Sequence, residues 1–300
     1  MAETISTARA STTSAAPPPT ELDAELAGLD ALDTAPGPTV EWPARFWSAL
    51  WPKLVAVAIF LTIWQLLVSF EVKPSYVLPG PLAVLSELQR LASEGLIGKM
   101  MSTTLTRAAV GFALAAAIGV VIGALVSRIS VLRVGVGSML TSLQTMPSIA
   151  WFPFSIMLFQ LSESAILFVV VLGAAPAIAN GLMSGTDQVP PLLLRAGTVL
   201  GARRWSLFWN VVLPASLPTF VGGRKQGWAF AWRSLLAGEI IVIIPSRPSL
   251  GAQLAVSRDL ADAPALVATM VLIFVIGVFV DAGFGVAERG LLRRRDLLLH

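Results

Sequence analysis

The sequence predicts an all-α, polytopic membrane protein with about six transmembrane helices. Of its 300 residues 55% are hydrophobic and only 13% are charged, and the mean hydropathy of +0.77 lies above that of water-soluble domains. Apolar stretches near the roughly 20 residues that a spanning helix needs also recur along the chain. Together these two observations place the chain in a bilayer.

Five stretches approach the length of a span: about 52–70, 104–126, 165–183, 215–244 and 265–287. A sixth, about 134–159, is interrupted by Pro147 and Pro153. Prolines remove backbone hydrogen bonds, which a membrane helix tolerates where neighbouring helices or a water-lined cavity replace the lost partners. We therefore expect the sixth segment to border a pathway.

The regions outside the spans suggest four parts. Residues 1–44 are rich in Ala, Ser, Thr and Pro and predict a disordered cytoplasmic tail without the features of a cleaved signal. Residues 45–103 hold the first transmembrane helix and an extracytoplasmic amphipathic segment, residues 104–292 form the core, and residues 293–300 form a basic cytoplasmic tail. Most Lys and Arg residues of the connections fall on one side if both termini are cytoplasmic.

The composition excludes most enzyme chemistry. There is no cysteine, and the single histidine is His300, so disulfides, thiol nucleophiles, zinc clusters and a histidine base inside the fold are not expected. Only Glu239 and Asp281 offer carboxylates within or near spans. The arginines lie beside apolar segments rather than on an aromatic-interleaved basic face, so we expect no catalytic residue, no metal site and no nucleic-acid partner.

The second span carries small residues at four-residue spacing, namely Gly111, Ala115, Gly119 and Gly123. This spacing puts them on one helical face and predicts the close approach of a second helix. The alternative is that Gly and Ala are simply common in membrane helices.

The connection before the fifth span predicts two short helices. Pro190 and Pro191 suit a first helical turn, Gly201 suits a helix end, and Pro214 suits the start of the next span. The helical spacing of Trp205, Phe208, Trp209 and Val212 predicts one apolar face on the second short helix. Such a helix is also typical of segments that lie at lipid headgroups.

This connection resembles the coupling loop of ABC importer permeases. The family pattern is Glu-Ala-Ala, three residues, Gly, nine residues and Ile-x-Leu-Pro; here Arg195-Ala-Gly197, Gly201 and Val211-Val-Leu-Pro214 keep the spacing, with Arg and Gly at two positions. Further similarity covers about residues 55–292 and is greatest to the nitrate, sulfonate and taurine permeases. It rests on Tyr76-Val-Leu-Pro-Gly-Pro81, Leu105-Thr-Arg107 with Gly111-Phe112, Met146-Pro147 and Ala237-Gly-Glu239.

The resemblance implies a type I ABC importer permease-like (MetI-like) fold in a bacterial cytoplasmic membrane. It also implies a homodimer with the pathway at the subunit interface, two ATPase chains and an extracytoplasmic solute-binding protein. The loop 184–214 would dock on the ATPase through Arg195, Ala196, Gly197, Gly201, Ala202, Arg203, Trp205, Leu213 and Pro214. Because the chain has no phosphate-binding loop, ATP would bind to the partner, and no cofactor is expected in this chain.

Charged residues inside spans point to the cargo. Arg233 lies near the middle of its span among aromatic residues, and a guanidinium matches the oxygens of a sulfonate or carboxylate. An Arg233–Glu239 pair is the alternative, whereas Arg107 is expected to extend outward to headgroups. The candidate pathway residues are therefore Arg233, Glu239, Met146 and Pro147.

These expectations favour a permease subunit for a small organic anion such as an aliphatic sulfonate. An ion-coupled secondary transporter that uses Glu239 and Arg233 is the main alternative. A channel is less favoured, because the sequence shows no filter-like motif.

Overall fold

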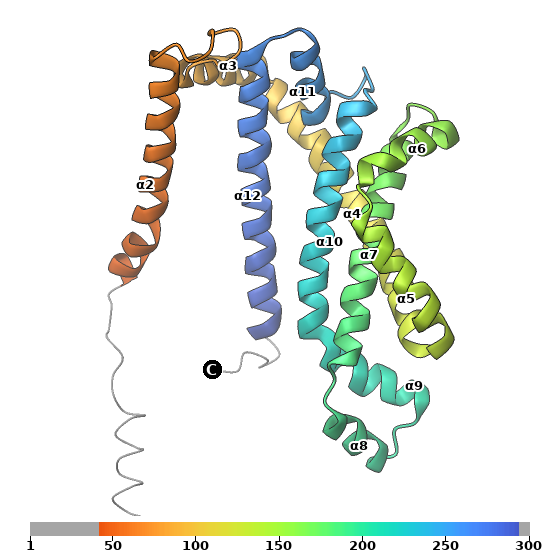
Figure 1. Ribbon diagram of the computed structural model, residues 1–300. Coiled ribbons are helices and arrows are strands. Elements are labelled where there is room, and N and C mark those ends of the chain that lie inside the picture. The colour runs from red at the N-terminus through yellow and green to blue at the C-terminus, as the bar shows by residue number, and fades with distance from the viewer. Residues whose placement is uncertain (1–41, 294–300) are drawn as a thin grey trace, which may run out of the picture. The chain divides into compact units, whose positions relative to one another are not determined.

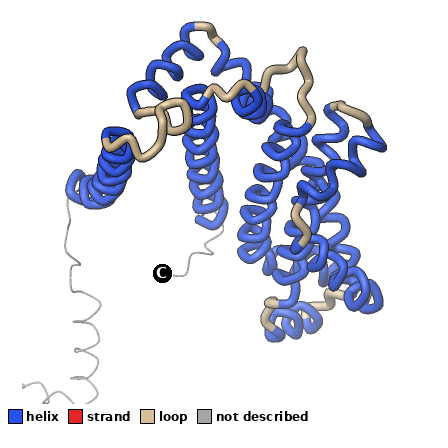
Figure 2. The backbone as a smooth tube through the Cα atoms, turned by 45° about the horizontal axis from the view of Figure 1, so that its top comes forward, coloured by secondary structure: helices blue, strands red, loops and turns tan. Residues whose placement is uncertain are grey.

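A computed structural model describes residues 42–293, and these residues form helices without any strand (Figures 1 and 2). The predicted tail 1–44 lies outside the described residues except for its last three positions, which begin α2 (Trp42–Ser69). The C-terminal tail is likewise outside them beyond Arg293.

The chain divides into two units, Met1–Phe60 and Leu61–His300. The second unit contains α3 to α12. Its long helices are α4 (Leu96–Arg128), α7 (Glu163–Asp187), α10 (Leu213–Ile241) and α12 (Ala263–Arg293). The shorter ones are α3 (Pro81–Ser93), α5 (Ser130–Thr145), η1 (Ser148–Trp151), α6 (Phe152–Phe159), α8 (Pro191–Val199), α9 (Arg204–Leu207), η2 (Phe208–Val212) and α11 (Leu250–Asp259).

Among the described residues, four helical segments are long and apolar enough to cross a membrane. They are Leu50–Ser69, Leu96–Arg128, Glu163–Asp187 and Ala263–Gly283. The predicted span 215–244 is the 29-residue helix α10, which is about 43 Å long at ~1.5 Å per residue. It carries Arg224, Lys225, Arg233 and Glu239, so it is less apolar than the other four.

The predicted interruption of the segment 134–159 is confirmed. α5 ends at Thr145, η1 follows Pro147, and α6 has Pro153 in its first turn. A proline suits the start of a helix because the first backbone N–H groups have no partner within the helix. The segment is therefore a series of short helices rather than one continuous span.

Helix α7 forms the centre of the core and packs against both α4 and α10. The small residues of α4 face it, because a Cβ atom added at Gly119 would lie 2.7 Å from the Ala175 carbonyl oxygen, and one at Gly123 would lie 2.9 Å from the Ala179 carbonyl oxygen. Larger side chains would force the helices apart. The tight packing predicted from the four-residue spacing is confirmed.

A second close contact, between α7 and α10, was not predicted. Gly181 and Gly223 face each other, and a Cβ atom added at Gly181 would lie 2.6 Å from the Gly223 Cα atom. Backbone atoms cannot rotate away as a side chain can, so the two helices would have to separate.

Replacing Gly181 with alanine is therefore expected to destabilise the protein by about 1–3 kcal/mol, the usual cost of overpacking. Thermal unfolding in detergent measures this, with Gly222→Ala as the matched control, since a Cβ atom at Gly222 meets nothing within 4 Å. Equal melting temperatures for the two variants would contradict the helix contact.

The two ends of the second unit differ. Figure 1 shows α3 and α11 at one end and α8 and α9 at the other. α3 buries Val84 and Leu91 and exposes Arg90, which pairs with Glu87 and Glu94. These hydrogen bonds raise the pKa of Arg90 further above its usual range, so the residue keeps its charge.

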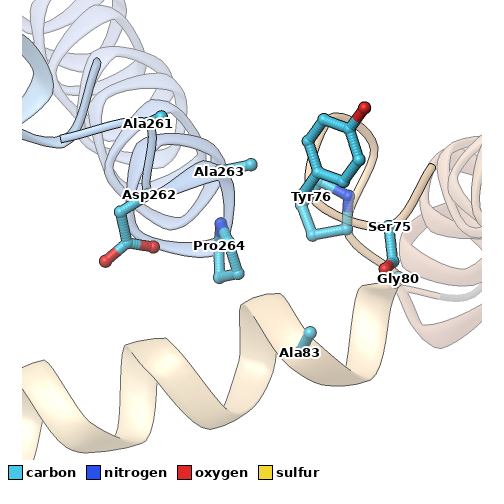
Figure 3. Close-up of a pocket in the computed structure, with 9 residues that line it drawn as sticks. Ser75, Tyr76, Gly80, Ala83, Ala261, Asp262, Ala263 and Pro264 are labelled. Atoms are coloured by element: carbon cyan, nitrogen blue, oxygen red, sulfur yellow. The ribbon is translucent and has the colours of Figure 1, made fainter. Parts of the chain in front are cut away.

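A small concavity lies at the α3 end. It has a volume of about 410 Å³ and lies between the 75–80 loop, the first turn of α3 and the turn that joins α11 to α12. Figure 3 shows Tyr76 on one side and Ala261 to Pro264 on the other.

Candidate functional site

The connection between α7 and α10 forms the two predicted short helices, and Gly201 ends the first. The Ala202 N–H donates to the Gly197 carbonyl at 3.0 Å, and the Gly201 N–H donates to the Thr198 carbonyl at 3.0 Å. With Gly201 at φ +88°, this is a Schellman motif, in which a left-handed residue closes the helix. Pro191 begins α8, and Leu213 and Pro214 begin α10.

Gly197 permits α8 to lie close to the next segment. It is buried, and a Cβ atom there would lie 2.7 Å from Leu207 Cδ1 and 3.0 Å from Val211 Cγ2. The family pattern has alanine at this position. In this chain glycine leaves the space that Leu207 and Val211 occupy.

Arg128 connects the loop to α4. Its Nη1 atom donates to the Arg204 carbonyl at 3.1 Å, and its guanidinium lies 4.6 Å from the Trp205 ring centroid and 5.0 Å from that of Phe208. These cation–π contacts anchor the second short segment on the last turn of α4. Sequence reasoning missed this role, because nothing in the sequence connects Arg128 with a tryptophan 77 positions later.

The four residues of the apolar face predicted for the second short helix are not equally buried in the structure. α9 has only four residues and continues as the π-helical turn η2. The wider π turn rotates later residues away from the α-helical spacing. Phe208 is buried, whereas Trp205 and Trp209 are 65% and 55% exposed.

The tip of the loop exposes large apolar side chains. Leu192, Val199 and Leu200 are 75%, 86% and 87% exposed. Arg195 and Ala196 of α8 and Arg203 at the start of α9 are exposed as well, and Ala202 is partly buried. The predicted coupling residues thus lie around one protruding surface, except Gly197, Leu213 and Pro214, which shape its base.

A buried charge cluster lies near the start of α7 and the end of α10, at the opposite ends of these helices from the loop. Arg107 is 5% exposed; its Nη1 lies 2.9 Å from Glu239 Oε1, and its Nη2 lies 2.6 Å from Glu163 Oε1. The expectation that Arg107 extends outward is therefore wrong, since α7 and α10 each supply a carboxylate that holds it inside. Glu239 pairs with Arg107, and the Arg233–Glu239 alternative is not what the structure shows.

Glu239 is fully buried, and each of its oxygens has a donor. The Thr104 hydroxyl lies 3.0 and 3.1 Å from the two oxygens, and the Gly251 N–H donates at 3.0 Å. A buried charge is stable only when such partners replace water. The cluster joins α4, α7, α10 and α11, and it places Glu239 between packed helices.

A groove lies between α10 and α12, with a volume of about 790 Å³. Trp228, Trp232 and Arg233 line it from α10, and Phe274 and Asp281 line it from α12. Met146 and Pro147 lie at the break between α5 and η1, outside the set of residues that line this groove. Of the four candidate pathway residues, only Arg233 faces it.

The described residues contain no group of three or more His, Cys, Asp or Glu side chains that could hold a metal ion. The candidate site is thus a protruding loop, a buried charge cluster and an apolar groove with one arginine.

Comparison with known families decides what this arrangement belongs to. Residues 115–293 match the family described as the binding-protein-dependent transport system inner membrane component. The chain belongs to this family. It is the membrane permease subunit of an ABC importer, which decides against the ion-coupled transporter and a channel.

Several curated permeases are similar over most of the chain. The nitrate import permease NrtB of Synechocystis sp. is 28% identical over 63% of this chain and 70% of its own length. The putative aliphatic sulfonates permease SsuC of Bacillus subtilis is 26% identical over 82% and 88%. The riboflavin permease RibX of Chloroflexus aurantiacus is 28% identical over 81% and 91%. These names give three different cargoes.

Solved importers share the fold of this permease. A chain of the inward-facing MetNI methionine ABC transporter aligns with a TM-score of 0.56 at 20% identity, covering 66% of this permease and 95% of that chain. A chain of an amino acid ABC transporter aligns with a TM-score of 0.52 at 15% identity, covering 69% of this permease and 97% of that chain. The predicted MetI-like fold is confirmed.

Proposed function

We propose that this permease takes up a small organic anion, such as an aliphatic sulfonate, and that a separate ATPase drives it through the loop 190–214. The observation that carries the proposal is the exposed apolar tip of this loop. Full burial of a leucine or valine side chain contributes about 1.5–3 kcal/mol, so Leu192, Val199 and Leu200 gain free energy when a partner covers them.

The loop is also suited to transmit a movement. The Schellman turn, the close contact at Gly197 and the contacts of Arg128 fix its shape, and Thr219 of α10 donates to Gln188 beside α7 at 3.0 Å. A displacement of the tip therefore moves α7 and α10 by a similar amount. Closure of an ATPase against the loop would move these core helices.

The other partners follow from the family. We propose two ATPase chains that bind the ATP, a second copy of this permease, and a solute-binding protein. With both termini cytoplasmic, the loop faces the ATPase, and the α3 end with the concavity near Tyr76 faces the binding protein. This permease would itself need no cofactor.

Arg233 supports an anionic cargo. Placing a guanidinium near the centre of a membrane helix costs about 2.5–3.5 kcal/mol of insertion free energy. Such a charge is therefore usually found with a partner of opposite charge. Within the described part of the chain, no carboxylate pairs with Arg233, and its guanidinium lies 5.4 Å from the Phe230 ring centroid.

Uptake into proteoliposomes tests the proposal. Vesicles with the permease, the candidate ATPase and the binding protein are expected to accumulate labelled butanesulfonate only when ATP and Mg²⁺ reach the ATPase. A protonophore and a sodium ionophore should leave the initial rate unchanged. Uptake that needs an ion gradient and continues without the ATPase would contradict the proposal.

A further inference from the structure

The groove between α10 and α12 lies wholly within the second unit and is lined mainly by apolar side chains. The Trp228 and Trp232 rings stack with centroids 6.2 Å apart and planes at 24°. The Phe112 ring meets Trp228 edge-on at 5.3 Å and so supports it from α4. Facing them, Met270 and Phe274 of α12 are 52% and 71% exposed. The groove thus presents flat aromatic surfaces.

Two positions on its wall are charged, and only one has a charged partner. Asp281 lies 3.5 Å from Lys225. Arg233 forms no ion pair among the described residues, and its guanidinium lies over the Phe230 ring. An anion that enters the groove therefore meets one cation that no carboxylate neutralises.

The groove is too large for an inorganic anion alone. Its volume of about 790 Å³ falls within the roughly 300–1,000 Å³ range of sites for drug-sized molecules, which are typically apolar with a few polar groups. A nitrate ion would fill a small part of it and leave the Trp232 and Phe274 rings uncovered. A ring-bearing molecule would cover the open faces of these two rings and gain offset stacking as well as burial.

We propose that the groove binds an organic anion with a flat, apolar ring system, its acidic group on Arg233 and its ring against Trp232 and Phe274. This inference rests on the proposed function and specifies which organic anions the groove binds most tightly: aryl sulfonates and aryl carboxylates, above aliphatic ones. Charge complementarity at Arg233 favours this occupant over a lipid tail, which carries no anionic group to pair with the guanidinium.

Equilibrium dialysis of the purified permease in lipid nanodiscs tests the proposal, with empty nanodiscs subtracted. The probe is naphthalene-2-sulfonate. We expect the wild type to bind the probe saturably. The affinity should fall at least tenfold in Arg233→Gln and several-fold in Trp232→Leu. Arg233→Lys should bind more tightly than Arg233→Gln but less tightly than the wild type. Arg258→Gln is the matched control, because Arg258 is an exposed cation outside the groove, and it should bind as the wild type does.

Four results would overturn the proposal. Binding that is the same in Arg233→Gln and wild type would remove the anion contact. Displacement by equal concentrations of taurine or nitrate would show that the ring contributes nothing. Failure to saturate, or equal binding of neutral 2-naphthol, would assign the groove to lipid or to a second copy. None of these results affects ATP-driven uptake of butanesulfonate, so the proposed function would remain open to its own test.

Discussion

Replacing Arg107 with methionine is expected to destabilise the folded permease by about 3–5 kcal/mol, the cost of breaking a buried ion pair from one side. Glu239 is fully buried and would lose its counter-charge while keeping the Thr104 and Gly251 donors. Methionine fills a similar volume, so the missing charge rather than a cavity dominates the effect.

Thermal unfolding of the purified protein in detergent measures this loss. Arg247→Gln is the matched control, since Arg247 lies 3.6 Å from Glu163 and its side chain is 61% exposed, which makes its ion pair worth about 0–1 kcal/mol. The double variant Arg107→Met with Glu239→Gln should recover part of the loss, because no uncompensated charge remains at Glu239. If Arg107→Met and the wild type have the same melting temperature, the cluster does not have this stabilising role.

The second large effect is expected at the loop tip, where Leu200→Asp should prevent the ATPase from co-purifying. Leu200 is 87% exposed and follows the last turn of α8, so the fold tolerates the change. A carboxylate buried in an apolar contact surface without a partner costs several kcal/mol. Since each 1.4 kcal/mol is a factor of ten, we expect affinity to fall by more than a hundredfold.

Leu260→Asp provides the matched control for that experiment. Leu260 is also highly exposed, at 74%, but it follows α11 at the opposite end of the unit. Its variant should retain the ATPase. If both variants lose the ATPase equally, the effect comes from general destabilisation and the loop assignment loses its support.

The elements that sequence reasoning predicted well depend on local signals. Hydrophobic length marks the spans, Pro191 and Gly201 mark the ends of α8, and the four-residue spacing on α4 marks a packed face. Each of these signals acts within one helix. They suffice for the fold class and for the position of the two short helices in the loop 190–214.

The errors concern contacts between distant segments. Arg107 and Glu239 are 132 positions apart, and no local pattern shows that they meet. The contact of Gly181 with Gly223 is of the same kind. The π turn at Phe208–Val212, which changes the period of the second short helix, was likewise not predicted from the local pattern.

The most direct test of the central claim is site-specific cross-linking from the loop to the ATPase. The sequence contains no cysteine, so Leu200→Cys introduces one thiol that can carry a maleimide-linked benzophenone. Illumination of the assembled importer should join this permease to the ATPase, and Leu260→Cys should give no such product. A cross-link from position 260 but not from position 200, in a complex that still contains the ATPase, would contradict coupling through this loop.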